Sequence, residues 1–209
     1  MNYGLYYNKE KLGDILFVIF NSNANPDFIK KVENCVVLYK NNEIIGYNIF
    51  NISEVFKIKA HGFLPNCNKE LIGIINYVLK NNNLPILELQ KDSGFVIGKI
   101  ISFEEHPDSE HLHICLVDIG EEKPLQIVCG AHNAKLGMKV VCAKPYAFMP
   151  NGQQIIPSKL LGIESYGMLC SGRELNLPGY ENIRGLLEIN DSYNIGEDFW
   201  SKKNGRIRN

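Results

Sequence analysis

The sequence predicts a protein in two parts: a small α+β domain over residues 1–90, followed by an all-β barrel over residues 91–201. Two observations predict this fold class. Residues 1–88 are rich in Asn, contain no Arg, and combine strand-like runs with one amphipathic helix. From residue 95 onward, short β-rich runs alternate with turn residues. Such spacing is typical of a barrel or a sandwich, and about a hundred residues suits a five-stranded barrel.

Three apolar runs predict strands in the N-terminal domain. Residues 16–20 form a continuous apolar run, which indicates a buried strand. Residues 36–39 and 44–47 flank Asn41 and Asn42. Because Asn tolerates the positive φ that a tight turn requires, these two runs predict a β-hairpin.

Helices are expected at two places in this domain. The stronger signal places four apolar residues on one helical face, namely Leu71, Ile75, Val78 and Leu79. Asn68 is the expected N-cap, and the Asn run over 81–83 ends the helix. Pro26, which follows Asn25, predicts a second, shorter helix, because Pro favours the first helical position.

Short strands account for most of the predicted barrel. They are expected at residues 95–103, 112–119, 125–129, 140–143 and 185–189. Pro107 and Asp108 form the expected turn between the first two strands. The basic segment 202–209 is expected to be a tail outside the barrel.

Composition restricts the classes of function. The chain has 209 residues, 22 Lys and Arg, 23 Asp and Glu, and a formal net charge of −1. Proteins that coat phosphate usually carry a basic excess, so any nucleic-acid site must be local. The start of the chain has no leader pattern, and no apolar run approaches the roughly 18 residues needed to cross a bilayer. We therefore expect a cytoplasmic protein without a membrane partner.

The cysteine and histidine residues predict neither a metal site nor an enzyme. None of the six cysteines forms a C-x-x-C pair, which favours reduced core cysteines. His106, His111 and His113 lack a carboxylate or Cys at ligand spacing. Cys129 and His132 have no third group to orient them as a nucleophile and base. We expect no catalytic residue, no metal and no cofactor.

Six stretches of this chain resemble segments of a known protein family. They are residues 98–100, 106–112, 117–120, 126–133, 158–171 and 174–177. In this order they resemble the tRNA-binding domain near the N-terminus of the phenylalanyl-tRNA synthetase β subunit. The motifs Val-Cys-Gly-Ala at 128–131 and Met-Leu-Cys-Ser at 168–171 are typical of this phenylalanyl-synthetase branch of tRNA-binding domains. Because the domain here follows some ninety other residues, the layout is similar to the YtpR-type family of free-standing bacterial tRNA-binding-domain proteins.

This resemblance implies an OB fold and binding of tRNA or other structured RNA. OB barrels bind RNA on one face, through cations on phosphates and side chains on bases. The expected cations are Lys99, Lys144, Lys159 and Arg173. The family places a Ser and a Met on the RNA-facing surface, which implies Ser165, Met168 and Ser171 here. His106, His111 and Asn133 complete the expected set. For each of these residues a purely structural role is the alternative, and Met168 is also a candidate for the barrel core.

Four positions depart from the family pattern. Close relatives usually carry Lys in place of His111 and Arg in place of Leu161. They usually carry Gly in place of Tyr146 and Asn176. Two cations are therefore missing from the expected binding region, and each lost phosphate contact weakens binding.

The sequence thus favours a non-catalytic tRNA- or RNA-binding protein. The alternative is a protein-interaction or oligomerisation module, related to the domains appended to synthetases. A homodimer is a candidate assembly, because related free-standing domains pair through their barrels.

Overall fold

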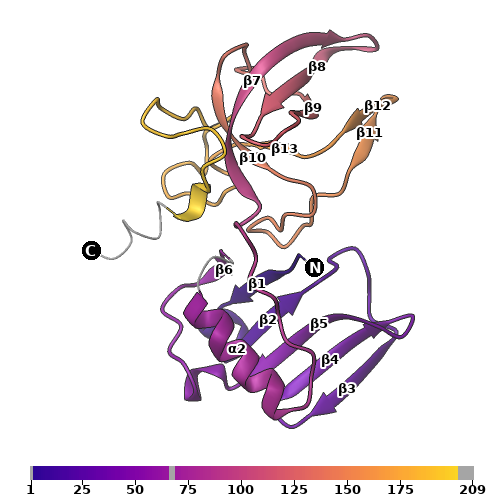
Figure 1. Cartoon of the computed structure of the whole chain (residues 1–209), viewed down its shortest axis with the longest axis vertical. Helices are drawn as coiled ribbons and strands as arrows, with labels where there is room; N and C mark the ends of the chain where they lie inside the picture. The colour runs from indigo at the N-terminus through magenta and orange to yellow at the C-terminus, as the bar shows by residue number, and fades with distance from the viewer. Residues whose placement is uncertain (1, 66–68, 202–209) are drawn as a thin grey trace. The chain divides into compact units, whose positions relative to one another are not determined.

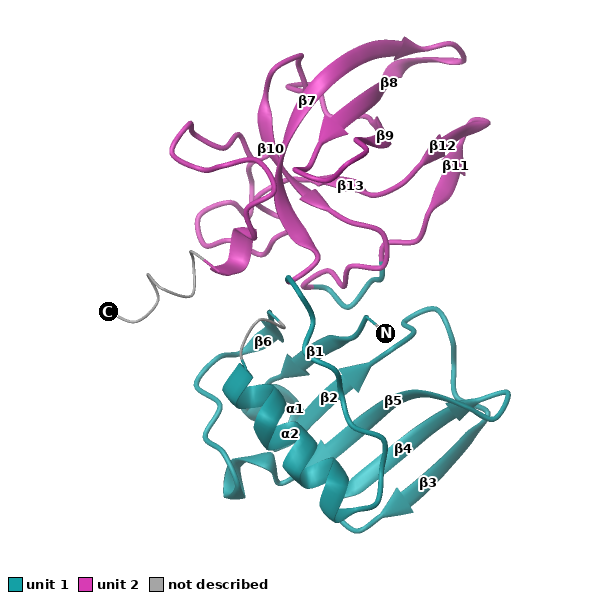
Figure 2. Ribbon diagram, in the orientation of Figure 1, with its two compact units in different colours: residues 1–92, 151–154 teal, residues 93–150, 155–209 magenta. Residues whose placement is uncertain are grey.

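The computed structural model describes residues 2–65 and 69–201, which form two compact units (Figures 1 and 2). The first unit comprises residues 1–92 and 151–154, and the second comprises residues 93–150 and 155–209. The expected N-cap Asn68 and the expected tail 202–209 lie outside the described residues.

The first unit is one antiparallel sheet of six strands with a helix across one face (Figure 1). The strands in spatial order are β3 (Phe28–Val32), β4 (Cys35–Lys40), β5 (Glu43–Phe50), β2 (Ile15–Ile19), β1 (Gly4–Tyr7) and β6 (Gly62–Leu64). The covering helix is α2 (Lys69–Asn81), and the short elements are α1 (Lys9–Leu12) and η1 (Ile52–Glu54). The expected strand at residues 16–20 and the expected long helix are confirmed.

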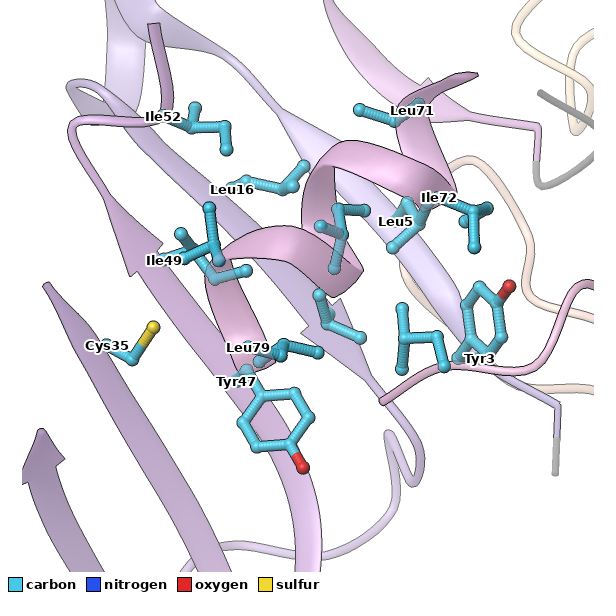
Figure 3. Close-up of a cluster of buried hydrophobic side chains, with 14 of the residues drawn as sticks. Tyr3, Leu5, Leu16, Cys35, Tyr47, Ile49, Ile52, Leu71, Ile72 and Leu79 are labelled. Atoms are coloured by element: carbon cyan, nitrogen blue, oxygen red, sulfur yellow. The ribbon is translucent and has the colours of Figure 1, made fainter. Parts of the chain in front are cut away.

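The core of this unit lies between the sheet and α2 (Figure 3). The helix buries Leu71, Ile72, Ile75, Val78 and Leu79, which recur at the spacing of one helical face. The sheet contributes every second residue of its strands, because successive strand side chains alternate between faces. The main contributors are Leu5, Tyr7, Leu16, Val18, Cys35, Val37, Tyr47 and Ile49.

The hairpin between β4 and β5 is confirmed. Asn41 and Asn42 have φ values of 50° and 64°, the left-handed conformation that Asn tolerates. The short helix expected after Pro26 is wrong, because residues 28–32 form the edge strand β3. This segment pairs with β4 along its whole length, and those sheet hydrogen bonds outweigh the weak helix-start signal of one Pro.

The second unit is a curled five-stranded antiparallel sheet with a separate small hairpin. Its strands in spatial order are β13 (Met168–Cys170), β10 (Lys139–Ala143), β7 (Phe95–His106), β8 (Ser109–Asp118) and β9 (Leu125–Cys129). β11 (Ser158–Leu160) and β12 (Ile163–Ser165) form the hairpin. The chain after β12 reaches the free edge of β9, where Tyr166 N–H donates to the Gln126 carbonyl at 2.8 Å.

Four of the five strands expected in this unit are confirmed, and the fifth is wrong. Residues 185–189 form no strand: they make an isolated bridge between Glu188 and Val140, and the Leu187 N–H donates singly to the Cys170 carbonyl. Gly185 has a φ of 91°, which turns the chain away from an extended path.

Apolar strand residues and buried thiols fill the interior of the curled sheet. Val96, Ile100, Val117, Ile127 and Val140 pack together with Cys115 and Cys142. Burial raises the pKa of the Cys115 and Cys142 thiols to about 12. These cysteines therefore behave as small hydrophobic residues, as expected.

Candidate nucleic-acid interface

His106 joins the tips of two hairpins in the second unit. Its Nδ1 atom accepts a hydrogen bond from the Asp108 N–H at 3.1 Å. The ring therefore carries its hydrogen on Nε2, which lies 3.2 Å from the Leu160 carbonyl and donates to it. His106 is 4% exposed. Both ring nitrogens form hydrogen bonds within the protein, so we assign His106 a structural role. We call these two bonds, which connect the β7–β8 hairpin with the β11–β12 hairpin, the tip clasp.

Replacing His106 with Ala is expected to cost about 1–2 kcal/mol of stability, because the Leu160 carbonyl and the Asp108 N–H lose their partner. Urea unfolding of the full chain measures this. The matched control is His111→Ala, since His111 is exposed on β8 and its loss should change stability by less than about 0.5 kcal/mol. Equal stabilities of the two variants would rule out the clasp.

Ser165 and Ser171 are buried and use their hydroxyls inside the barrel. The Ser165 Oγ atom accepts from the Val128 N–H at 3.1 Å, which holds the end of β12 against β9. The Ser171 Oγ atom donates to Glu174 Oε2 at 2.7 Å and accepts from the Glu174 N–H at 3.2 Å. The Ser171 N–H also donates to Glu174 Oε2 at 2.7 Å, which completes a capping box that the Ser-x-x-Glu spacing of the sequence could have revealed. Both hydroxyls are thus used in hydrogen bonds within the unit, although Ser171 also lines the cavity described below.

Two of the expected lysines are paired with carboxylates. Lys144 lies 3.3 Å from Glu121, and Lys159 lies 3.0 Å from Glu164 on the neighbouring strand. Lys99 is partly exposed on β7, opposite Asp118. Surface pairs of this kind are worth only about 0–1 kcal/mol, so phosphate can replace the carboxylate. The net charge around Lys144 and Lys159 is nevertheless close to zero, because each lies beside a carboxylate.

Asn133 acts as a bridge between two loops. Its Oδ1 atom accepts from the Leu186 N–H at 2.7 Å, and its Nδ2 donates to the Leu186 carbonyl at 3.1 Å. The side chain thus makes the two backbone hydrogen bonds to Leu186, in the segment 183–187, that a neighbouring strand would otherwise make. A Cβ atom on Gly185 would lie 2.5 Å from Asn133 Oδ1, so only Gly fits beside this bridge.

A cavity of about 540 Å³ lies beside this bridge. Its lining residues come from the end of β9 and the following loop, from β13, from the capped turn and from the segment held by Asn133. They are Val128, Cys129, Gly130, Ala131, His132, Met168, Leu169, Ser171, Arg173, Glu174, Ile183, Arg184, Gly185 and Leu186. Met168 and Arg173 of the expected set therefore meet in one place.

Arg184 is the cation that sequence reasoning missed. The chain contains four arginines, of which two lie in the part that the structure describes, and both line this cavity. Neither Arg173 nor Arg184 forms an ion pair with another described residue. The scarcity of Arg in the rest of the chain is the signal that could have identified Arg184.

Backbone conformation gives a reason for the Gly expected at two of the four positions that depart from the family pattern. Tyr146 and Asn176 have φ values of 66° and 50°, the left-handed region in which glycine carries no steric cost. Leu161 also has a positive φ, 44°, in the turn of the β11–β12 hairpin. The Gly expected at the first two positions therefore has a conformational reason. The Leu161 side chain is 57% exposed at that turn.

Within residues 2–65 and 69–201, no group of three His, Cys, Asp or Glu residues is arranged to hold a metal ion. The same residues contain no helix that is long and apolar enough to cross a membrane.

The second unit belongs to a recognised class of nucleic-acid-associated domain. Residues 95–198 match the family described as "Putative tRNA binding domain". Residues 27–91 match a domain of unknown function, DUF4479. The chain as a whole belongs to the YtpR family. It is 36% identical over 198 residues to the "Putative tRNA-binding protein YtpR" of Bacillus subtilis, and the match covers 93% of this chain and 98% of that protein.

Other relatives match either the whole chain or the second unit. The "Uncharacterized protein MG449" of Mycoplasma genitalium is 32% identical, over 93% of this chain and 86% of that protein. The phenylalanine–tRNA ligase β subunit of Aromatoleum aromaticum is 50% identical over 106 residues, which cover 51% of this chain and 13% of that protein. The resemblance to both families is thus confirmed.

Among solved structures, the C-terminal domain of Plasmodium vivax p43 matches 49% of this chain and 56% of its own, at 25% identity and a TM-score of 0.37. A MetRS-related protein from Pyrococcus horikoshii matches 51% of this chain and 88% of its own, at 20% identity and a TM-score of 0.39.

Proposed function

We propose that this protein binds tRNA or another structured RNA through its second unit and performs no catalysis. The observation that carries the proposal is the meeting of Arg173 and Arg184 beside Met168, in a unit that matches a tRNA-binding domain family. Arginine is suited to phosphate, and an exposed thioether is suited to the face of a base. The name of the Bacillus subtilis relative, "Putative tRNA-binding protein YtpR", agrees with such a role.

The strand order supports an OB-type barrel as the scaffold. β7, β8 and β9 form a meander, β10 returns to pair with β7, and β13 pairs with β10. A five-stranded, partly open barrel of this type binds nucleic acid on one face and in the adjoining loops. We therefore propose two domains with a sequence boundary near residue 92, and an RNA face on the second.

Charge in the second unit favours recognition by shape and bases. Four of its lysines lie within 4 Å of a carboxylate, namely Lys135, Lys139, Lys144 and Lys159. Among the described residues of this unit, Arg173, Arg184, Lys99 and Lys123 have no carboxylate within 4 Å and remain available to phosphate. With so few, RNA binding should depend only moderately on salt.

Binding of total tRNA to the full chain tests the proposal. We expect a gel-mobility shift at about micromolar protein in low salt. The logarithm of the association constant should fall with the logarithm of salt concentration with a slope of about −2 to −3, for two or three phosphate contacts. The absence of any shift at low salt, with folded protein, would refute the proposed function.

Thiol chemistry is an unsuitable alternative at Cys129, which lies three residues before His132. Burial raises the pKa of the Cys129 thiol, and this outweighs the lowering by the Ala131 N–H that donates to its sulfur. The group therefore stays protonated near neutral pH and is a poor nucleophile. The five described cysteines are free and buried, as in proteins of the reducing cytosol, where we propose that this protein acts.

A second candidate function is association through the first unit. The edge strand β3 exposes Phe28 and Ile29, each at 59%. Exposed apolar edge strands pair readily with another chain. Light scattering of the full chain distinguishes a dimer from a monomer, and a monomer at high concentration would remove this candidate.

A further inference from the structure

We propose that the arginine-lined cavity of the second unit holds a single unstacked nucleotide, with its base on Met168 and Ile183 and its phosphate between Arg173 and Arg184. This inference rests on the proposed RNA-binding function and specifies the part of the RNA that the protein recognises. It predicts that loops and single-stranded ends bind, whereas a continuous duplex does not.

The size of the cavity suits one nucleotide. Its volume of about 540 Å³ lies within the range of roughly 300–1,000 Å³ that is typical of pockets for small organic ligands. A free phosphate would leave most of this space empty. A base within a duplex has both faces covered by its neighbours, so it would have to leave the stack to enter.

One part of the lining is apolar and suited to a base. Met168 is partly exposed on β13, with buried Leu169 next to it. Ile183 is 51% exposed, although it lines the cavity, so its side chain is available to a ligand. Thioether and aliphatic groups pack on base faces with little dependence on sequence, so the cavity should accept more than one type of base.

Another part of the lining is cationic and suited to a phosphate. Arg173 and Arg184 are exposed, and neither is paired with a carboxylate among the described residues. Glu174 is the one carboxylate in the lining, and its Oε2 atom is held 2.7 Å from both the N and the Oγ of Ser171. Since this carboxylate is engaged in the capping box, two guanidinium groups remain for a phosphate. Arginine binds phosphate with two parallel hydrogen bonds.

Both arginines are carried by anchored segments. Arg173 lies within the turn capped by Ser171 and Glu174. Arg184 lies two residues before Leu186, which Asn133 holds, and the Leu187 N–H donates to the Cys170 carbonyl of β13 at 3.0 Å. Anchoring lowers the entropy that ligand binding would otherwise lose. The cavity is therefore preorganised for its ligand.

Fluorescence anisotropy with a labelled single-stranded RNA hexamer of mixed sequence, alone or annealed to its complement, tests this inference alongside total tRNA. We expect the wild-type chain to bind the single strand and tRNA, and to bind the duplex at least about tenfold more weakly. Arg173→Ala/Arg184→Ala should weaken binding of the hexamer and of tRNA by about 10- to 100-fold, because hydrogen bonds to charged groups are lost. It should also reduce the magnitude of the salt slope by about 1–2.

Two further variants separate the contributions. Met168→Ala should weaken binding without changing the salt slope, since it removes contact with the base and leaves the charges in place. Lys123→Ala/Lys135→Ala removes two charges from the same unit outside the cavity, and it should retain affinity within about threefold. Circular dichroism confirms that each variant is folded.

Each outcome bears on a different statement. If the wild-type chain binds no tRNA, both the proposed function and this inference fail. If it binds tRNA and the double arginine variant binds equally well, RNA binding stands and the cavity is not its site. Equal affinity for the single strand and the duplex would also overturn the inference.

Discussion

Replacing Asn133 with Ala is expected to destabilise the second unit by about 2–3 kcal/mol and, as a consequence, to weaken the proposed binding of RNA. The side chain makes two hydrogen bonds to the backbone of Leu186, at 2.7 and 3.1 Å. Leu186 is 8% exposed, so water cannot readily replace the lost partners. An unpaired buried N–H or C=O costs about 1–3 kcal/mol, which makes the loss of both large for one exchange.

Urea unfolding followed by tryptophan fluorescence measures this effect. Trp200 is the single tryptophan of the chain, is 9% exposed, and packs edge-to-face on Phe95 in the second unit. His132→Ala is the control, because His132 is an exposed neighbour of Asn133 with no part in the bridge. A midpoint for Asn133→Ala that equals the control would show that the bridge contributes nothing.

Replacing Asp14 with Ala is expected to destabilise the first unit by about 3 kcal/mol, because one carboxylate there accepts three hydrogen bonds. The Tyr7 hydroxyl and the Ser53 N–H donate to its Oδ1 atom at 2.9 and 3.2 Å. The Ser53 hydroxyl donates to Oδ2. Asp14 thereby connects the end of β1 with η1, and its loss leaves the buried Tyr7 hydroxyl without an acceptor.

The stabilisation by Asp14 should depend on pH with a defined sign. Burial opposes ionisation, but the hydrogen bonds from Ser53 and Tyr7, together with the charge of Lys9, outweigh it and lower the pKa of Asp14. A carboxyl with a lowered folded-state pKa stabilises fully above its unfolded-state pKa of about 3.9, and this contribution disappears as pH falls through the folded-state value. The difference between wild type and Asp14→Ala should therefore be constant from about pH 5 to 8 and decrease below about pH 4.

Thermal unfolding followed by circular dichroism at several pH values measures this dependence. Lys9→Ala is the matched control. The Lys9 side chain is 55% exposed and lies 3.6 Å from Asp14, so its removal should cost less than about 1 kcal/mol. A difference that stayed the same down to pH 2 would contradict the assignment of the ionised carboxylate.

Local patterns predicted most of the secondary structure, because hydrophobic periodicity and turn chemistry act over a few residues. The apolar spacing from Leu71 to Leu79 determined α2, and Asn41 and Asn42 determined the hairpin of β4 and β5. The helix predicted after Pro26 was wrong because one Pro is a weak helix signal. Pairing of β3 with β4 decided that this segment is a strand. The same cause explains the missing strand at residues 185–189, where the Asn133 bridge and the turn at Gly185 fix the path.

The sequence by itself determined the two-part β architecture and the family, since both depend on the order of motifs along the chain. Only the tertiary structure decided the roles of individual polar residues, because a side chain's partner is chosen by contacts between distant segments. His106 and Ser165 were expected at the interface, yet they bond to Leu160 and Val128. Arg184 carried no motif, yet the fold brings it to a cavity with Arg173 and Met168. Burial and hydrogen bonds between distant segments separate the residues that hold the second unit together from those that stay exposed on its surface.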